Sequence, residues 1–221
     1  CDGDAIAIET SMLLEILAAL KSAFPALRHV GTYAGPLSTL QKSMSELSAL
    51  RNAGLTKAYL GVETGDDRLL REVNKGAGYD EMLRAGLNLR NAGINLSSMV
   101  LLGLAGRESS QLHAAETGRV LSAIDPEYVG ALSLMLIPGT PMHTDYENGR
   151  FDLITPEEML KELGTMIAAT HLTDGLFHAN HASNYLPIRA HLPRDREKTL
   201  ALIAQALDGK VRLKPEYMRA L

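Results

Sequence analysis

The chain has 221 residues, enough for one large domain with a buried core. It carries 22 lysines and arginines against 26 aspartates and glutamates, and the resulting net charge of −4 gives no electrostatic footprint for nucleic acid or an anionic membrane. No apolar run approaches the roughly 20 residues that a bilayer crossing requires. The single cysteine, Cys1, excludes an internal disulfide and a cysteine-rich zinc site. We expect a cytoplasmic globular protein.

The first predicted element is the C-terminal end of a strand, formed by CDGDAIAI at the start of the sequence. We therefore expect the sequence to be the downstream part of a longer protein. Apolar residues at helical spacing predict a helix over 13–24, and Pro25 ends it. A short strand is predicted over 28–33.

A repeated unit of helix, glycine and strand follows. Ser43 and Glu46 form a capping box at the start of a helix, and Gly54 is the expected left-handed residue at its end. A strand over 57–62 comes next, and LRNAGI at 89–94 repeats the arrangement before LSSMVLLGLAG. Such near-continuous apolar strands are typical of parallel sheets that are buried on both faces.

The later elements continue this alternation. We predict a helix at 109–124, a strand at 128–136, a helix beginning at Thr155-Pro156, a strand at 175–182 and a helix at 195–208. Right-handed β–α repetition allows either a barrel or an open doubly wound sheet. The sequence contains no G-x-G-x-x-G loop and no Walker A motif, which favours an α/β fold with a full or partial TIM-like (β/α) barrel of parallel strands.

Polar residues and glycines gather where the predicted strands end. These positions are Asp2-Gly3-Asp4, 33–36, Glu63-Thr64-Gly65, 103–106 and 138–141. The carboxyl ends of barrel strands converge on one mouth, where binding and catalytic residues collect. Any single glycine here could simply turn a corner, but the five ends together favour a site, with Asp4, Glu63, Gly103 and Pro138 around one hollow.

Four segments carry a resemblance to a known family. GVETGDDRLLREVNKG (61–76) resembles the G-x-E-S-G segment of the radical S-adenosylmethionine (SAM) superfamily, in particular its branch of oxygen-independent coproporphyrinogen oxidases and methylthiotransferases. DGD (2–4) stands where that family has Gly-Gly-Glu, GLAGRE (103–108) resembles its G-L-P-G-E loop, and IPGTPMH (137–143) its P-G-T-P segment. The order of the four motifs matches the family over roughly 1–145.

The resemblance implies roles for these residues in holding SAM. The backbone of Asp2, Gly3 and Asp4 is expected to meet the amino group of the methionine part. Glu63 and Thr64 are expected to bond the ribose hydroxyls or the methionine part. A second group is expected to hold adenine: Gly103, Gly106 and Pro138.

The family's defining C-x-x-x-C-x-x-C loop is absent from the sequence. Its three thiolates ligate a 4Fe–4S cluster, and Cys1 cannot replace three ligands. The resemblance therefore implies a fragment, inactive by itself, of an enzyme that reductively cleaves SAM, with cluster ligands outside this chain. It also implies a small-molecule substrate and an electron donor such as flavodoxin or ferredoxin. The role of Cys1 itself is expected to be that of a small buried hydrophobe.

Other polar residues have structural interpretations. His178 and His181 are expected to be surface or hydrogen-bonded histidines rather than metal ligands, because a strand would point them to opposite faces. Asp66-Asp67 should cap the helix after the ETG turn, and Lys75 should end that helix.

Two other functions stay open from the residues alone. One is a cluster-free barrel lyase or isomerase that uses Glu63 as an acid or base, and the other is a non-catalytic ligand-binding domain. We expect residues 1–145 to form a partial barrel that lacks its first strand, and 146–221 to form a C-terminal helical extension. A missing strand would leave a sheet edge unpaired, which predicts self-association of this piece.

Overall fold

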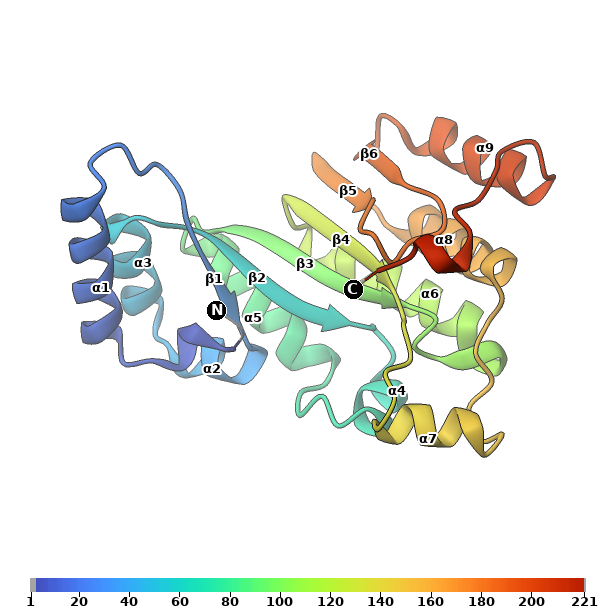
Figure 1. Ribbon diagram of the computed structural model, residues 1–221. Helices are drawn as coiled ribbons and strands as arrows, with labels where there is room; N and C mark the ends of the chain where they lie inside the picture. Colours follow the sequence, from blue (N-terminus) through green and yellow to red (C-terminus); the bar gives the residue numbers. More distant parts are fainter. Residues whose placement is uncertain (1–2, 221) are drawn as a thin grey trace.

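The computed structural model describes residues 3–220, and its centre is one six-stranded sheet whose strand order follows the chain (Figure 1). The strands are β1 (Val30–Ala34), β2 (Leu55–Glu63), β3 (Asn95–Leu102), β4 (Tyr128–Ser133), β5 (Gly175–Ala179) and β6 (Ile188–Leu192). Neighbours from β1 to β5 are parallel, and β6 is antiparallel to β5. The predicted α/β fold with a partial TIM-like barrel is confirmed.

Helices connect the strands. They are α1 (Thr10–Ala23), α2 (Pro36–Gln41), α3 (Met44–Ala53), α4 (Asp67–Glu72), α5 (Tyr79–Asn91), α6 (Gly106–Ile124), α7 (Pro141–Glu147), α8 (Pro156–Ala169) and α9 (Arg196–Leu207), with short 3-10 helices η1 (Ala5–Ala7) and η2 (Glu216–Met218). The expected capping boxes form at the starts of α3 and α8, with Ser43 and Thr155 as N-caps. Gly54 ends α3 with φ of 114°, a conformation that favours glycine.

The two faces of the sheet differ in burial. In β4, Val129, Ala131 and Ser133 are buried, while the residues that alternate with them, Tyr128, Gly130 and Leu132, are only half-buried. The buried side chains pack against helices that include α3, α5, α6 and α8, and we call this side the covered face. The other side, which we call the open face, carries the more exposed residues that alternate with the buried ones, such as Tyr33 in β1, Gly61 in β2 and His178 in β5. A parallel sheet is normally covered on both faces, so an open face fits the interior side of an unclosed barrel.

Two parts of the sequence interpretation were wrong or incomplete. Residues 3–8 do not end a strand as expected: residues 5–7 form the 3-10 helix η1, and the Asp4 carboxylate before it accepts hydrogen bonds from Gly35 and Ser38 at the start of α2. The predictions for Cys1 and Asp2 lie outside the described residues. The short elements α2, α7 and β6 were not predicted.

The region after residue 145 adds strands as well as helices. β5 and β6 extend the sheet that β1–β4 begin, and α8 packs against α6. The division into 1–145 and 146–221 stays a prediction, as does self-association through the outer edge of β1. Among the helices of residues 3–220, none combines the length and apolarity needed to span a bilayer.

Candidate functional site

A cavity of about 340 Å³ opens at the carboxyl ends of β1 and β2, on the open face. Its lining includes Gly3, Asp4, Tyr33, Gly61, Glu63 and Lys75. Three of the residues predicted to bind a cofactor, from two distant parts of the sequence, therefore share one hollow.

Asp4 fixes the turn at the entrance to this cavity. One carboxylate oxygen accepts a hydrogen bond from the backbone N–H of Gly35 at 2.7 Å, and the other accepts one from the hydroxyl of Ser38. A side chain at position 35 would displace the Asp4 carboxylate, so glycine leaves room for this contact. Because both of its carboxylate oxygens already have partners, Asp4 offers the cavity mainly its backbone.

Glu63 ends β2 in an unusual conformation. Its φ is 61°, in the left-handed region that non-glycine residues rarely adopt, and the register with β3 shifts between Gly61 and Glu63. One carboxylate oxygen, Oε1, accepts a hydrogen bond from Lys75 Nζ at 2.9 Å. Within residues 3–220 the second oxygen has no such partner, and the side chain is 29% exposed. A strained residue that holds a free carboxylate oxygen at a cavity is typical of a functional position.

Lys75 does not lie in the last turn of a helix, where the sequence predicted it. Helix α4 ends at Glu72, so Lys75 follows the helix instead of ending it. Its ammonium group reaches back to Glu63 across the cavity. Asp66 does cap α4 as predicted, because its carboxylate accepts the N–H of Arg68.

Thr64 belongs to a buried polar network on the covered face. Its hydroxyl lies 2.7 Å from Nδ1 of His113 on α6. Nε2 of His113 lies 3.6 Å from the carboxylate of Glu162 on α8, and both side chains have no exposed surface. Glu162 in turn accepts the backbone N–H of Gly103 at 2.6 Å and the hydroxyl of Ser110. Helices α6 and α8 thus hold the ends of β2 and β3 through the Thr64–His113 and Gly103–Glu162 hydrogen bonds, while Nε2 of His113 has no hydrogen-bond partner among the described residues.

Burial keeps this network neutral over much of the pH range. Loss of solvent raises the pKa of Glu162 to about 7, although the hydrogen bonds from Ser110 and Gly103 oppose that change. Loss of solvent also lowers the pKa of His113 to about 4. The uncharged forms of both groups are therefore favoured between these values, and a full ion pair is not.

The remaining residues expected to bind adenine lie elsewhere. Gly106, with φ of 62°, lines a second cavity of about 670 Å³ between α4, α6 and α7. Gly103 packs against Met159 of α8, and Pro138 is an exposed residue in the turn before α7; neither of them lines either cavity. The structure thus brings Gly3, Asp4 and Glu63 together, while the cofactor roles of Thr64, Gly103, Gly106 and Pro138 stay predictions.

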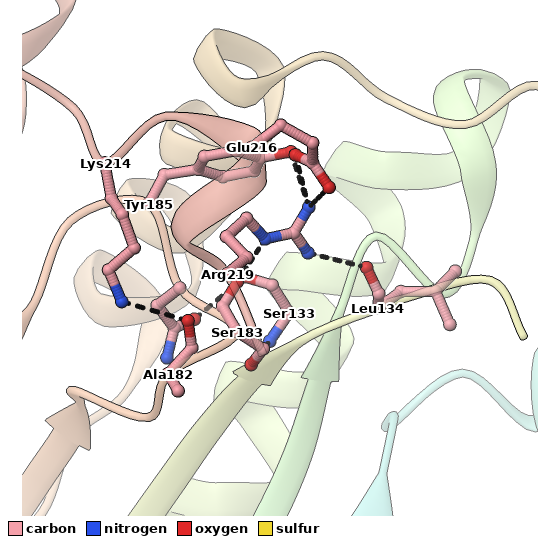
Figure 2. Close-up of polar contacts among 9 residues, drawn as sticks. Ser133, Leu134, Ala182, Ser183, Tyr185, Lys214, Glu216 and Arg219 are labelled. Atoms are coloured by element: carbon pink, nitrogen blue, oxygen red, sulfur yellow. Dashed lines mark hydrogen bonds and ion pairs between the residues drawn. The ribbon is translucent and has the colours of Figure 1, made fainter. Parts of the chain in front are cut away.

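A clasp near the C-terminus holds the chain just beyond β4 (Figure 2). Arg219 donates to the carbonyl oxygens of Leu134 (2.9 Å) and Ser183 (2.6 Å), and its side chain is 3% exposed. Its guanidinium lies over the ring of Tyr185 and pairs with Glu216. Burial, followed by the hydrogen bond with Glu216, raises the pKa of Tyr185 to about 12. The clasp fixes the start of the segment that contains Pro138.

The donor set of the chain does not fit a 4Fe–4S cluster. Such a cluster requires several thiolate ligands, and the sequence has one cysteine. Within residues 3–220 there is also no group of three histidine, cysteine, aspartate or glutamate side chains arranged to hold a metal ion. His181 instead forms a hydrogen bond with Ser183, and His178 lies on the open face of β5.

Several residues of the site were missed in the sequence. Tyr59 lines the cavity, beside Tyr33 from the predicted strand end 33–36, and His113 and Glu162 support its neighbouring loops. Tyr59 could have been found, because residues 57, 59, 61 and 63 alternate with the buried apolar positions of β2. His113 and Glu162 each lie on a helix with no local motif, so only the tertiary contact reveals them.

Comparison with known proteins agrees with this architecture. The family model described as radical SAM superfamily matches residues 5–113. The heme chaperone HemW of Bacillus subtilis is 26% identical over 145 residues, which is 65% of this chain and 37% of that protein. The chain therefore spans well under half of the length of this curated relative.

Solved structures show the same fold. The archaeal Elp3 of Methanocaldococcus infernus superposes with a TM-score of 0.62 at 13% identity, covering 95% of this chain and 54% of that one. Coproporphyrinogen III oxidase (HemN) from Escherichia coli, described as a radical SAM enzyme, gives 0.57 at 16% identity, covering 73% and 36%. The family match over residues 5–113 and the sequence relative make this chain similar to the radical SAM superfamily, and the solved structures show the same fold.

Proposed function

We propose that this chain is the core part of an enzyme that binds SAM in the cavity between Asp4 and Glu63 and uses it to start radical chemistry on a small molecule. The observation that carries the proposal is Glu63, a strained residue whose free carboxylate oxygen faces this cavity. The sulfonium and amine of SAM are cationic and its ribose carries two hydroxyl donors, so a carboxylate acceptor suits it.

The other lining groups complement SAM in the same way. Lys75 keeps one oxygen of Glu63 occupied and thereby orients the carboxylate. The backbone of Gly3 and Asp4 offers polar groups to the methionine part, since the Asp4 side chain is engaged by Gly35 and Ser38. Gly61 leaves room for the Glu63–Lys75 pair, because a side chain there would lie within 3 Å of both groups.

The thiolate ligands of the cluster lie outside this chain in the proposal, because Cys1 is its only cysteine. SAM held in this cavity would supply the radical chemistry, with one electron delivered from outside this chain. A flavodoxin or ferredoxin is the proposed source of that electron. The residues of this chain bind and orient the cofactor and exclude water from it. We place the enzyme in the cytoplasm, where reduced clusters persist.

The test uses the full-length protein that carries this chain, reconstituted with iron, sulfide and a reductant. We expect cluster absorbance and release of 5′-deoxyadenosine from SAM, measured by chromatography with mass detection. Glu63→Gln should raise the KM for SAM about tenfold, because one charge-assisted hydrogen bond is weakened. Glu157→Gln, an exposed change on α8, is the matched control.

The alternatives predict different results. A reconstituted protein with neither cluster absorbance nor 5′-deoxyadenosine would refute the proposal. A lyase or isomerase that uses Glu63 as an acid or base would turn over its substrate without SAM, and Glu63→Gln would abolish that activity. A ligand-binding domain would bind SAM without consuming it even when the cluster is present.

A further inference from the structure

Glu63 lies at the centre of a three-residue turn. The N–H of Thr64 donates to the carbonyl oxygen of Val62 at 2.8 Å, so this hydrogen bond spans Glu63, whose φ is 61°. A bond between residues i and i+2 around a positive φ is the pattern of the rare, strained form of the γ-turn. Such a turn persists only where the surrounding structure holds it, so the contacts around Glu63 decide where its carboxylate points.

The contact of Glu63 on the open face is a weak restraint. Its carboxylate accepts a hydrogen bond from Lys75, whose side chain is 23% exposed and follows helix α4. A partly exposed ion pair of this kind contributes little to stability, because solvent screens it. The turn therefore needs a restraint on its other side.

Helix α6 supplies this restraint on the covered face. Thr64 has no exposed surface, and its hydroxyl lies 2.7 Å from Nδ1 of His113. The next N–H, that of Gly65, donates to the hydroxyl of Thr117 at 3.1 Å. A side chain at Gly65 would lie 2.1 Å from the carbonyl oxygen of Glu116. Both residues that follow Glu63 are thus docked on one helix.

The hydroxyl of Thr64 has a defined direction. Its oxygen accepts the N–H of Asp66 at 3.0 Å, so its hydrogen is left for Nδ1 of His113. We therefore assign Nδ1 as the acceptor, with the proton of the neutral ring on Nε2, 3.6 Å from the carboxylate of Glu162. Because the His113 ring has no exposed surface, water cannot take the place of this acceptor.

Binding and positioning groups are separated by the sheet. The lining of the cavity includes Glu63 and Lys75 but neither Thr64 nor His113. A substitution at position 64 or 113 therefore leaves every side chain that lines the cavity in place, while it removes the bond that holds the turn. Ligand affinity in such variants reports on the position of Glu63 alone.

We propose that Thr64 and His113 are positioning residues, whose hydrogen bond on the covered face holds Glu63 in the γ-turn and thereby sets the affinity of the cavity for its cationic ligand. The inference rests on the proposed function only in naming that ligand SAM. It gives Thr64 a role other than the direct contact with the cofactor that the sequence predicted.

The first test follows the turn itself, in the full-length protein without SAM. Hydrogen exchange of the amides at positions 64 and 65, located by mass spectrometry, should be about tenfold faster in His113→Leu and in Thr64→Val, because each change removes one partner of the bond. His113→Asn has nearly the shape of His113→Leu but keeps an acceptor near the place of Nδ1. Its exchange should stay within about twofold of the wild type.

The second test measures SAM binding by calorimetry in the same variants of the reconstituted full-length protein. The Kd should rise about tenfold in His113→Leu and in Thr64→Val. The double variant should also rise about tenfold instead of roughly a hundredfold, because both changes remove the same bond. The conservative changes Thr64→Ser and His113→Asn should retain the wild-type Kd. Val120→Ala, a core truncation further along α6, is the control: it should lower stability and leave the Kd unchanged.

The outcomes separate positioning from a general loss of stability. Additive losses in the double variant, equal harm from His113→Asn and His113→Leu, or the same loss in Val120→Ala would overturn the inference. Unchanged exchange at positions 64 and 65, or faster exchange with an unchanged Kd, would overturn it as well. If the wild type bound no SAM, the proposed function would fail, and amide exchange would still decide whether His113 holds the turn.

Discussion

Glu63 and Thr64 are adjacent in the chain but belong to opposite faces of the sheet. Glu63 is part of the open face, where its carboxylate meets Lys75 and a cavity. Thr64 is fully buried on the covered face, where its hydroxyl meets His113. Thr64, Glu162 and Ser110 of the covered face are hydrogen-bonded within the protein, whereas the second carboxylate oxygen of Glu63 on the open face has no such partner among the described residues.

Polar residues therefore have two roles in this protein: some support the fold and others remain accessible from the open face. On the covered face, Glu162 and His113 hold the ends of β2 and β3 in place. On the open face, Glu63 is available to a ligand. The same stretch of sequence, residues 63–64, thus contains one residue that lines a cavity, for which we propose a binding role, and one that is bonded inside the protein.

The largest expected effect is on the covered face. Glu162→Ala should lower the free energy of unfolding by about 3 kcal/mol, because it leaves a cavity and removes the partner of the Gly103 N–H and the Ser110 hydroxyl. Denaturant unfolding measures this change. Glu157→Ala, on the exposed side of the same helix, should change stability by less than about 0.5 kcal/mol. Equal effects of the two variants would contradict the supporting role.

The pH dependence of stability sharpens the same point. The pKa of Glu162 is raised from 4.5 to about 7, so its contribution is complete below pH 4.5 and is lost as the pH rises through 7. The pKa of His113 is lowered from 6.5 to about 4, so its contribution is present above pH 6.5 and is lost as the pH falls through 4. Between about pH 4.5 and 6.5, Glu162 therefore lowers the free energy of unfolding as the pH rises, while His113 raises it.

Without His113, the dependence of the unfolding free energy on pH should show the contribution of Glu162 alone. In His113→Gln the free energy of unfolding should fall by about 3 kcal/mol as the pH rises from 4.5 to 7, while the wild type changes much less. Urea unfolding at a series of pH values provides the measurement. Parallel profiles for the two proteins would show that the buried groups do not titrate in this way.

On the open face, Glu63→Gly should separate stability from binding. Glycine relieves the left-handed φ of 61°, worth about 1 kcal/mol, and removes a partly exposed ion pair worth less than that. The free energy of unfolding should therefore change by less than about 1 kcal/mol, while the Kd for SAM rises about tenfold or more. Unfolding and calorimetry on the same sample test both parts. A large loss of stability would place Glu63 among the supporting residues.

The smallest expected effect concerns Lys57. Lys57→Gln removes a positive charge near His178, so the pKa of that histidine should rise toward its ordinary value. A proton NMR titration of the His178 ring follows the shift, and Lys161→Gln, an exposed change on α8, provides the comparison. An unchanged titration would mean that the two groups do not sense each other across the open face.

The sequence predicted the fold well where local signals are strong. The capping boxes at Ser43 and Thr155 and the glycine at 54 placed helix ends correctly, because each satisfies backbone groups locally. The strand β6 was missed because five residues are too short to give a clear alternation of buried and exposed positions. The segment CDGDAIAI was misread because it is short and its last four residues are apolar. Its conformation depends on a tertiary hydrogen bond, in which the Asp4 carboxylate accepts from the Gly35 N–H.

The site was predictable only in part. Glu63 was visible because a carboxylate interrupts an apolar strand, and the family motif named it. The partner Lys75 and the supports His113 and Glu162 depend on contacts between residues 12 to 59 positions apart. No local pattern encodes such contacts, so the sequence could not distinguish a ligand-facing Glu63 from an internally bonded Thr64.

The order of assembly during synthesis follows from the sheet topology. Because each strand pairs with its predecessor in the chain, the sheet can grow strand by strand as the polypeptide leaves the ribosome. The clasp at Arg219 comes 85 residues after the Leu134 carbonyl that it holds. The Arg219 hydrogen bond can therefore form only after all six strands have been translated. Until then, the segment after β4 is not held by the C-terminal residues.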